Sequence, residues 1–130
     1  MKLRLEALQD KAGWEAVGVK LPQFDVQGMR KHTVETPVWV HFGAGNIFRG
    51  FVAMLQQELL NKGEATCGII AGDTFDYDII KKIYKPHDEL TMMVGLKPDG
   101  TTEREIVASI ADSVCADSSD AAEMEKLRKI

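Results

Sequence analysis

Residues 41–50 of this chain read His41-Phe42-Gly43-Ala44-Gly45-Asn46-Ile47-Phe48-Arg49-Gly50. A short run of strand-forming residues leads into them from Pro37. After them, apolar residues recur at helical spacing up to a stop at Gly63: Phe48, Phe51, Val52, Leu55 and Leu59. A buried strand that turns through Gly-x-Gly into an amphipathic helix is the arrangement that holds a dinucleotide pyrophosphate. The stretch therefore predicts an α/β fold with a nucleotide-binding turn.

The residues of the turn have separable roles. Gly43 can adopt the tight turn, Gly45 has no Cβ to block a phosphate, and the N–H groups at the helix start point toward the anion. Arg49, one turn into the helix, can add a cation. Phe48 stands where a third glycine normally lets helix and strand pack closely, so we expect the helix to sit further out or Phe48 to point aside. The alternative is a tight turn that binds no ligand.

A second apolar run, Ala65 to Ala71, lacks polar alternation and predicts a parallel strand covered on both faces. It completes one right-handed βαβ unit. Asp73 follows it, where a carboxylate can accept hydrogen bonds from the adenosine ribose hydroxyls. Its charge would repel a 2′-phosphate, which favours NAD over NADP. The alternative role of Asp73 is the N-cap of the next helix, and Asp76 is the reserve candidate for the ribose.

The second half of the chain predicts a helix, a hairpin and a further helix. Phe75 to Tyr84 is helical in pattern and closed by Pro86. Two strand-like runs, Glu89 to Leu96 and Glu103 to Val114, flank a proline-glycine turn, so we expect an antiparallel hairpin whose second arm continues into the sheet. Ala121 to Ile130 resembles the start of another helix.

These elements divide the chain into two parts. We expect residues 1–36 to form an N-terminal leader arm, with a short helix followed by an irregular segment. Residues 37–130 are expected to form the first half of a Rossmann-type, doubly wound NAD-binding domain, truncated before its second half. A length of 130 residues is too short for a nucleotide domain plus a substrate domain.

Composition narrows the class of protein. The formal charge of -4 and scattered basic residues argue against a nucleic-acid partner. The two cysteines form neither a disulfide framework nor a metal-ligand spacing, so we expect no metal. There is no signal peptide and no membrane-spanning run, which favours a cytoplasmic protein. The histidines have no partner spacing, and no catalytic constellation is visible.

The stretch HFGAGNIFRG resembles the HFGAGNIGRG opening of mannitol-1-phosphate dehydrogenases. From about Leu21 onward the chain is similar to the wider mannitol dehydrogenase and fructuronate reductase family of polyol-specific long-chain dehydrogenases. The similarity includes Leu21-Pro22-x-Phe24-Asp25 before the first strand, and Asp88-Glu89-Leu90-Thr91 followed by Val107-x-Ser109-Ile110 at the hairpin.

This resemblance implies that the dinucleotide is lined by Gly43, Ala44, Gly45, Asn46, Ile47, Phe48 and Arg49, with Asp73 near the ribose. It implies an oxidoreductase that interconverts a polyol or aldonate and its keto sugar, of the mannitol/fructose or mannonate/fructuronate type. Phe48 brings the chain closer to the branch that acts on unphosphorylated substrates. The family's catalytic lysine, asparagine and histidine lie in a C-terminal helical domain that we expect to be absent here, so we assign no catalytic residue and expect this part alone to be inactive.

Two other functions remain open at this point. One is a regulator that senses NAD through the same turn and catalyses nothing. The other is a methyltransferase, whose glycine-rich first turn and acidic end of the second strand have a similar sequence pattern.

Overall fold

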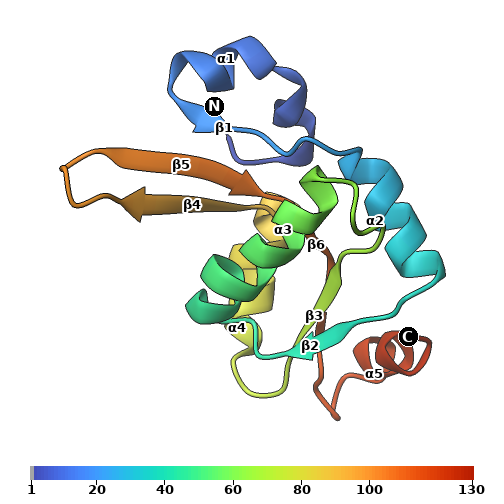
Figure 1. Cartoon of the computed structure of the whole chain (residues 1–130). Coiled ribbons are helices and arrows are strands. Elements are labelled where there is room, and N and C mark those ends of the chain that lie inside the picture. The colour runs from blue at the N-terminus through green and yellow to red at the C-terminus, as the bar shows by residue number, and fades with distance from the viewer. Residues whose placement is uncertain (1) are drawn as a thin grey trace.

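The computed structural model describes residues 2–130, and its six strands form two three-stranded sheets (Figure 1). The elements, with η marking 3₁₀ and π turns, are η1 (Leu5–Gln9), α1 (Lys11–Ala16), β1 (Val19–Lys20), α2 (Val26–Glu35), β2 (Val40–Phe42), η2 (Phe48–Val52), α3 (Ala53–Asn61), β3 (Ile69–Asp73), α4 (Tyr77–Ile79), η3 (Ile80–Tyr84), η4 (Lys85–His87), β4 (Thr91–Leu96), β5 (Thr102–Val107), β6 (Ile110–Cys115) and α5 (Ala121–Arg128).

The parallel sheet has the order β2-β3-β6. Its middle strand β3 is buried from Ile69 to Ala71, as the apolar run predicted. In the register of the sheet, Phe42 of β2 lies beside Gly72 of β3, so the turn after β2 and Asp73 at the end of β3 meet at the same edge. Successive parallel strands that are neighbours form the first half of a doubly wound fold.

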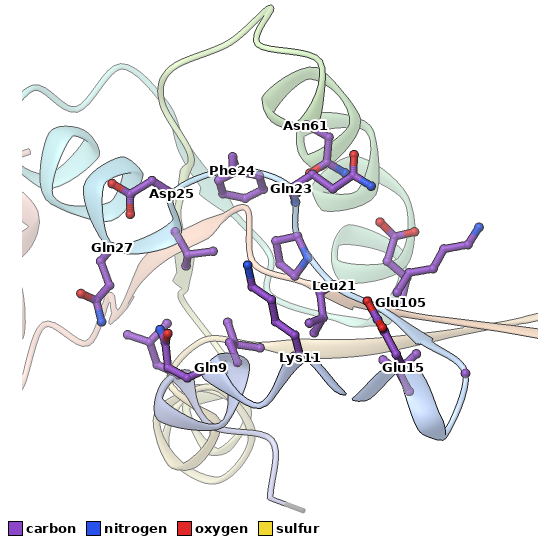
Figure 2. Close-up of a pocket in the computed structure, with 17 residues that line it drawn as sticks. Gln9, Lys11, Glu15, Leu21, Gln23, Phe24, Asp25, Gln27, Asn61 and Glu105 are labelled. Carbon is purple, nitrogen blue, oxygen red and sulfur yellow. Dashed lines mark hydrogen bonds between the residues drawn. The ribbon is translucent and has the colours of Figure 1, made fainter. Parts of the chain in front are cut away.

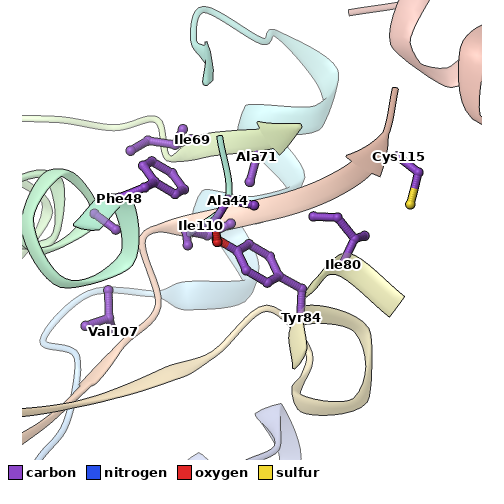
Figure 3. Close-up of a cluster of buried hydrophobic side chains, with 10 residues drawn as sticks. Ala44, Phe48, Ile69, Ala71, Ile80, Tyr84, Val107, Ile110 and Cys115 are labelled. Atoms are coloured by element: carbon purple, nitrogen blue, oxygen red, sulfur yellow. The ribbon is translucent and has the colours of Figure 1, made fainter. Parts of the chain in front are cut away.

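The main core joins η2, α3 and η3 to the strands β3 and β6 (Figure 3). Its largest fully buried members include Ile69 of β3, Ile80 of η3 and Ile110 of β6. Because a protein core is closely packed, a change in the size of one of its side chains can shift the side chains that contact it. The turn after β2 belongs to this core through Ala44, which is also fully buried.

The second sheet, β1-β5-β4, contains the predicted hairpin. The strands β4 and β5 are antiparallel and extend away from the rest of the molecule (Figure 1). After β5 only Ala108 and Ser109 separate the hairpin from β6, so its second arm enters the parallel sheet, as predicted. Buried Gln57 of α3 holds this crossing, since it donates to the carbonyl of Ile106 and accepts from the N–H of Ala108, both at 2.6 Å.

The leader contains more regular structure than the irregular segment that the sequence predicted. Helix α2 begins at a cap in which Asp25 accepts from the N–H of Gly28 (3.0 Å). It buries only Val26, Met29 and Thr33, a narrow stripe with one polar member, which explains the weak periodicity of this segment.

The strand β3 is shorter at its start than the apolar run predicted. The N–H of Gly68 donates to the hydroxyl of Thr33 (2.8 Å), and strand pairing begins at the next residue, Ile69, and not at Ala65.

Within residues 2–130, no helix combines the length and the apolar character needed to cross a membrane.

Candidate nucleotide-binding site

The candidate site is the turn from β2 into the long helix that contains η2 and α3. Gly43 has a φ of +110°, a conformation that favours glycine, and its N–H donates to the carbonyl of Gly72 (2.8 Å). The first intrahelical hydrogen bond runs from the N–H of Arg49 to the carbonyl of Gly45 (3.1 Å). The amides of residues 46–48 therefore have no intrahelical acceptor, and they carry the positive end of the helix dipole.

Gly45 differs from Gly43 in what it requires. Its φ lies outside the left-handed region, and no atom lies within 4 Å of the place that a Cβ would take. Neither backbone conformation nor internal packing therefore demands glycine at this position. The open space beside the helix start is the space that an incoming anion would use.

Phe48 occupies the place of the third glycine and points into the core, where it is 4% exposed. Its ring stacks on His41 of β2, with the ring centroids 4.2 Å apart and an angle of 9° between the ring planes. The helix is widened into a π turn at Phe48–Val52. Such a turn holds one residue more than a regular helical turn, and this one begins at Phe48 itself.

Asp73 at the end of β3 braces the turn. One carboxylate oxygen accepts from the N–H of Ala44 (3.2 Å), and the other accepts from Phe75 (2.9 Å) and Asp76 (2.7 Å). Partial burial acts to raise the pKa of Asp73, but the backbone hydrogen bonds of Phe75, Ala44 and Asp76 outweigh it and hold the pKa below its ordinary value. The carboxylate thus stays charged and closes the turn that follows β3. It is not the N-cap of the next helix, the alternative that the sequence offered, because α4 begins at Tyr77 and Asp76 holds that position.

Arg49 lies at the turn with its guanidinium held on two sides. One of its terminal nitrogens donates to the side-chain oxygen of Asn46. The guanidinium carbon lies 5.7 Å from the centre of the Tyr84 ring, within cation–π range. The Nε atom of Arg49 is buried and has no hydrogen-bond partner in the described part of the chain.

The predicted residues lie together at the turn, but they differ in exposure and in what they can offer a ligand. Asn46 and Ile47 are exposed, Ile47 by 82%. Ala44 is buried, and both its N–H and its carbonyl are engaged within the protein, by Asp73 and Tyr84. Ala44 therefore shapes the turn, and Phe48 can offer a ligand its backbone only. The side chain of Asp76 makes no cap hydrogen bond.

Tyr84 is the residue at this site that sequence reasoning missed. Its hydroxyl donates to the carbonyl of Ala44 (2.9 Å) from an element 40 residues further along the chain. No local pattern marks such a contact, since a tyrosine at the end of a helical segment is most simply explained as a core residue.

The histidines other than His41 lie away from the turn: His32 contacts Thr36 on α2, and His87 contacts the carbonyl of Leu3. No cluster of three or more His, Cys, Asp or Glu within residues 2–130 is arranged to hold a metal ion. A hollow of about 910 Å³ lies between the leader and the end of α3, lined by residues such as Gln9, Gln23 and Asn61 (Figure 2). None of its lining residues belongs to the turn, so it is separate from the candidate site.

Comparison with known proteins gives consistent results for sequence and fold. The chain is 48% identical, over 119 residues, to D-mannonate oxidoreductase of Thermotoga maritima, a match that covers 92% of the chain and 22% of that protein. Its fold matches mannitol 2-dehydrogenase of Pseudomonas fluorescens, solved as a ternary complex with NAD and D-mannitol, with a TM-score of 0.74, 25% identity and coverage of 95% of the chain and 23% of that enzyme.

A substrate-free D-sorbitol dehydrogenase also matches in fold, with a TM-score of 0.74, 24% identity and coverage of 98% of the chain and 24% of that structure. No family model matches the chain. The resemblance to the mannitol dehydrogenase and fructuronate reductase family is confirmed, as is the α/β fold of a partial Rossmann-type sheet with an antiparallel hairpin. The chain spans between 22% and 24% of the length of these relatives.

Proposed function

We propose that this chain, a part of a protein of the mannitol dehydrogenase and fructuronate reductase family, binds NAD through residues 43–49 and Asp73. The observation that carries the proposal is the open space at Gly45, because nothing inside the protein explains a glycine there. The solved complex of mannitol 2-dehydrogenase, which holds NAD, supports the choice of cofactor. When bound, NAD supplies the hydride-accepting chemistry.

The residues of the turn would share the binding of the cofactor. The amides of Asn46, Ile47 and Phe48 would donate to the pyrophosphate, and Arg49 would add a positive charge beside it. The carboxylate of Asp73 retains lone pairs beyond those used by the backbone and would accept from the ribose hydroxyls, with Asp76 as the reserve. Its negative charge would disfavour the 2′-phosphate of NADP.

For the complete protein we propose an oxidoreductase that interconverts a polyol or aldonate and its keto sugar. The identity of 48% with a D-mannonate oxidoreductase favours the sugar-acid substrate. Residues 1–36 would serve as a leader arm and residues 37–130 as the first half of the NAD-binding domain. We expect no dehydrogenase activity from this chain alone, because hydride transfer needs a base and orienting groups around the substrate carbon. A non-catalytic NAD-sensing regulator is the alternative.

Two titrations of the chain test the proposal. Binding of NADH is followed by the fluorescence of NADH, and binding of S-adenosylmethionine is followed by calorimetry. The chain should bind NADH and not S-adenosylmethionine. Gly45→Val should abolish NADH binding in a folded protein, since its side chain would fill the anion's space. Gly95→Val is the matched control, because Gly95 on β4 is also free of positive φ and of contacts closer than 4.0 Å. Unchanged NADH affinity in folded Gly45→Val would remove the phosphate-binding role from the turn.

A further inference from the structure

Tyr84 of η3 is a buried side chain whose hydroxyl is directed at the carbonyl of Ala44. Burial raises the pKa of Tyr84, and the nearby positive charge of Arg49 offsets only part of this effect. The phenol therefore stays protonated at neutral pH and is available as a donor. Ala44 lies between Gly43 and Gly45, so the hydrogen bond holds the middle of the turn against the core (Figure 3).

The ring of Tyr84 has a second contact at the same site. Arg49 lies over it, with its guanidinium carbon 5.7 Å from the ring centre. Asn46 accepts from one terminal nitrogen of the same guanidinium. Two fixed partners leave the guanidinium little freedom, and its buried Nε still lacks an acceptor among the described residues. One tyrosine thus contacts both the backbone of the turn and the cation that flanks it.

We propose that Tyr84 is a positioning residue for the diphosphate of the cofactor: its hydroxyl fixes the turn, and its ring fixes Arg49. The inference rests on the proposed binding of NAD by this turn. Tyr84 does not touch the ligand. It reduces the side-chain conformational entropy that Arg49 loses when the ligand binds, because the arginine is already held in place. Its two contacts can be removed separately, which makes the two roles distinguishable.

The experiment measures Kd for NADH and for ADP-ribose, which carries the diphosphate without nicotinamide. The variants are Tyr84→Phe, Tyr84→Leu, Arg49→Met and the two double variants that combine Arg49→Met with each change at Tyr84. Tyr84→Phe keeps the ring and should weaken both ligands about fivefold, the equivalent of one hydrogen bond. Tyr84→Leu should weaken them further. In the Arg49→Met background, the Phe and Leu variants should bind within about twofold of each other, because the ring acts through Arg49.

Ile80→Ala is the matched control for loss of stability, since Ile80 is buried in the same core and in the same element as Tyr84 but has no polar or aromatic group that could hold Ala44 or Arg49. All affinities are measured at a temperature at which urea titration shows each variant to be folded. Ile80→Ala should unfold more easily and bind NADH as the wild type does. If Tyr84→Phe and Tyr84→Leu behave in the same way as Ile80→Ala, Tyr84 is a core residue only and the inference is overturned. A wild-type chain that fails to bind NADH would instead refute the proposed function.

Discussion

Replacing Asp73 with asparagine separates the brace at Ala44 from the hydrogen bonds that Asp73 accepts from Phe75 and Asp76. Asparagine keeps one oxygen for the exposed N–H groups of Phe75 and Asp76, and it forms side-chain-to-backbone turns of this kind as aspartate does. Its amide group, however, would face the N–H of Ala44, a donor against a donor. The change therefore removes the side-chain hydrogen bond that joins the end of β3 to the turn, and it leaves the backbone bond from Gly43 to Gly72 in place.

The expected loss follows from the contacts. A hydrogen bond to a charged group contributes about 1.5–3 kcal/mol, and the bond at Ala44 is long at 3.2 Å, so we expect Asp73→Asn to lower the free energy of unfolding by about 1.5 kcal/mol. Asp73→Ala also removes the hydrogen bonds to Phe75 and Asp76, which adds about 1 kcal/mol. Asp76→Asn is the control, because its side chain makes no cap bond, and should stay within about 0.5 kcal/mol of wild type.

The pH dependence gives the sharper test. Because the pKa of Asp73 is lowered in the folded state, its stabilisation is present above the unfolded pKa of about 4 and is lost as pH falls below it. Urea unfolding, followed by tryptophan fluorescence, should show the gap between wild type and Asp73→Asn shrinking as pH falls from about 6 toward 2. A gap that is absent at pH 6, or that does not change with pH, would refute the brace.

The proposed ribose contact is tested in the complete protein. There Asp73→Ser should weaken the binding of NAD and relax the bias against NADP. An unchanged preference for NAD over NADP would move the ribose role to Asp76.

Three further predictions concern the frame around the site. Gln57→Leu should lower the free energy of unfolding by about 2–4 kcal/mol in urea titration, because it leaves the buried N–H of Ala108 without an acceptor; a neutral effect would contradict that role. Gly68→Ala should lower the free energy of unfolding by about 2 kcal/mol or more in the same titration, because a Cβ there would lie 2.4 Å from the carbonyl oxygen of Ser109. Wild-type stability would mean that the backbone moves aside without a cost in free energy. The raised pKa of Tyr84 means that its stabilisation is present below the ordinary value of about 10 and is lost as pH rises above it. The pKa of Tyr77 is raised as well, so an alkaline absorbance titration should show both tyrosines ionising above the ordinary value, and Tyr84→Phe should remove the later component.

The sequence was sufficient to predict the βαβ unit because its signals are local. The second half of the apolar run before Asp73, residues 68–71, is buried, and the helical spacing after Gly45 ends at Gly63, whose φ is +72°. The proline-glycine turn likewise predicted the hairpin. In each case the pattern lies within one element and reflects burial of that element alone.

The contacts that complete the site could not be predicted in this way. The brace from Asp73 to Ala44 spans 29 residues and the bond from Tyr84 to the same residue spans 40, so neither leaves a periodic trace. The sequence pattern did not predict helix α2 for a related reason. Its inward face includes Thr33, a polar residue whose hydrogen-bond partner, Gly68, lies on a distant segment. Long-range hydrogen bonds of polar side chains are fixed by the fold, and local pattern carries little information about them.

Phe48 shows that the requirements of fold and ligand fall on different residues of this turn. Restoring the third glycine with Phe48→Gly would bring the motif closer to the usual dinucleotide fingerprint. We nevertheless expect it to lower the free energy of unfolding by about 3–5 kcal/mol, because it deletes a ring that is 4% exposed and stacked on His41. The π turn begins at that residue, and glycine inside a helix would not restore regular winding by itself. Urea unfolding measures the loss, with Phe51→Gly as the control, since Phe51 lies in the same π turn but is largely exposed. Equal losses for the two variants would mean that the helical effect of glycine dominates, and that the core contact of Phe48 does not hold the helix to the sheet.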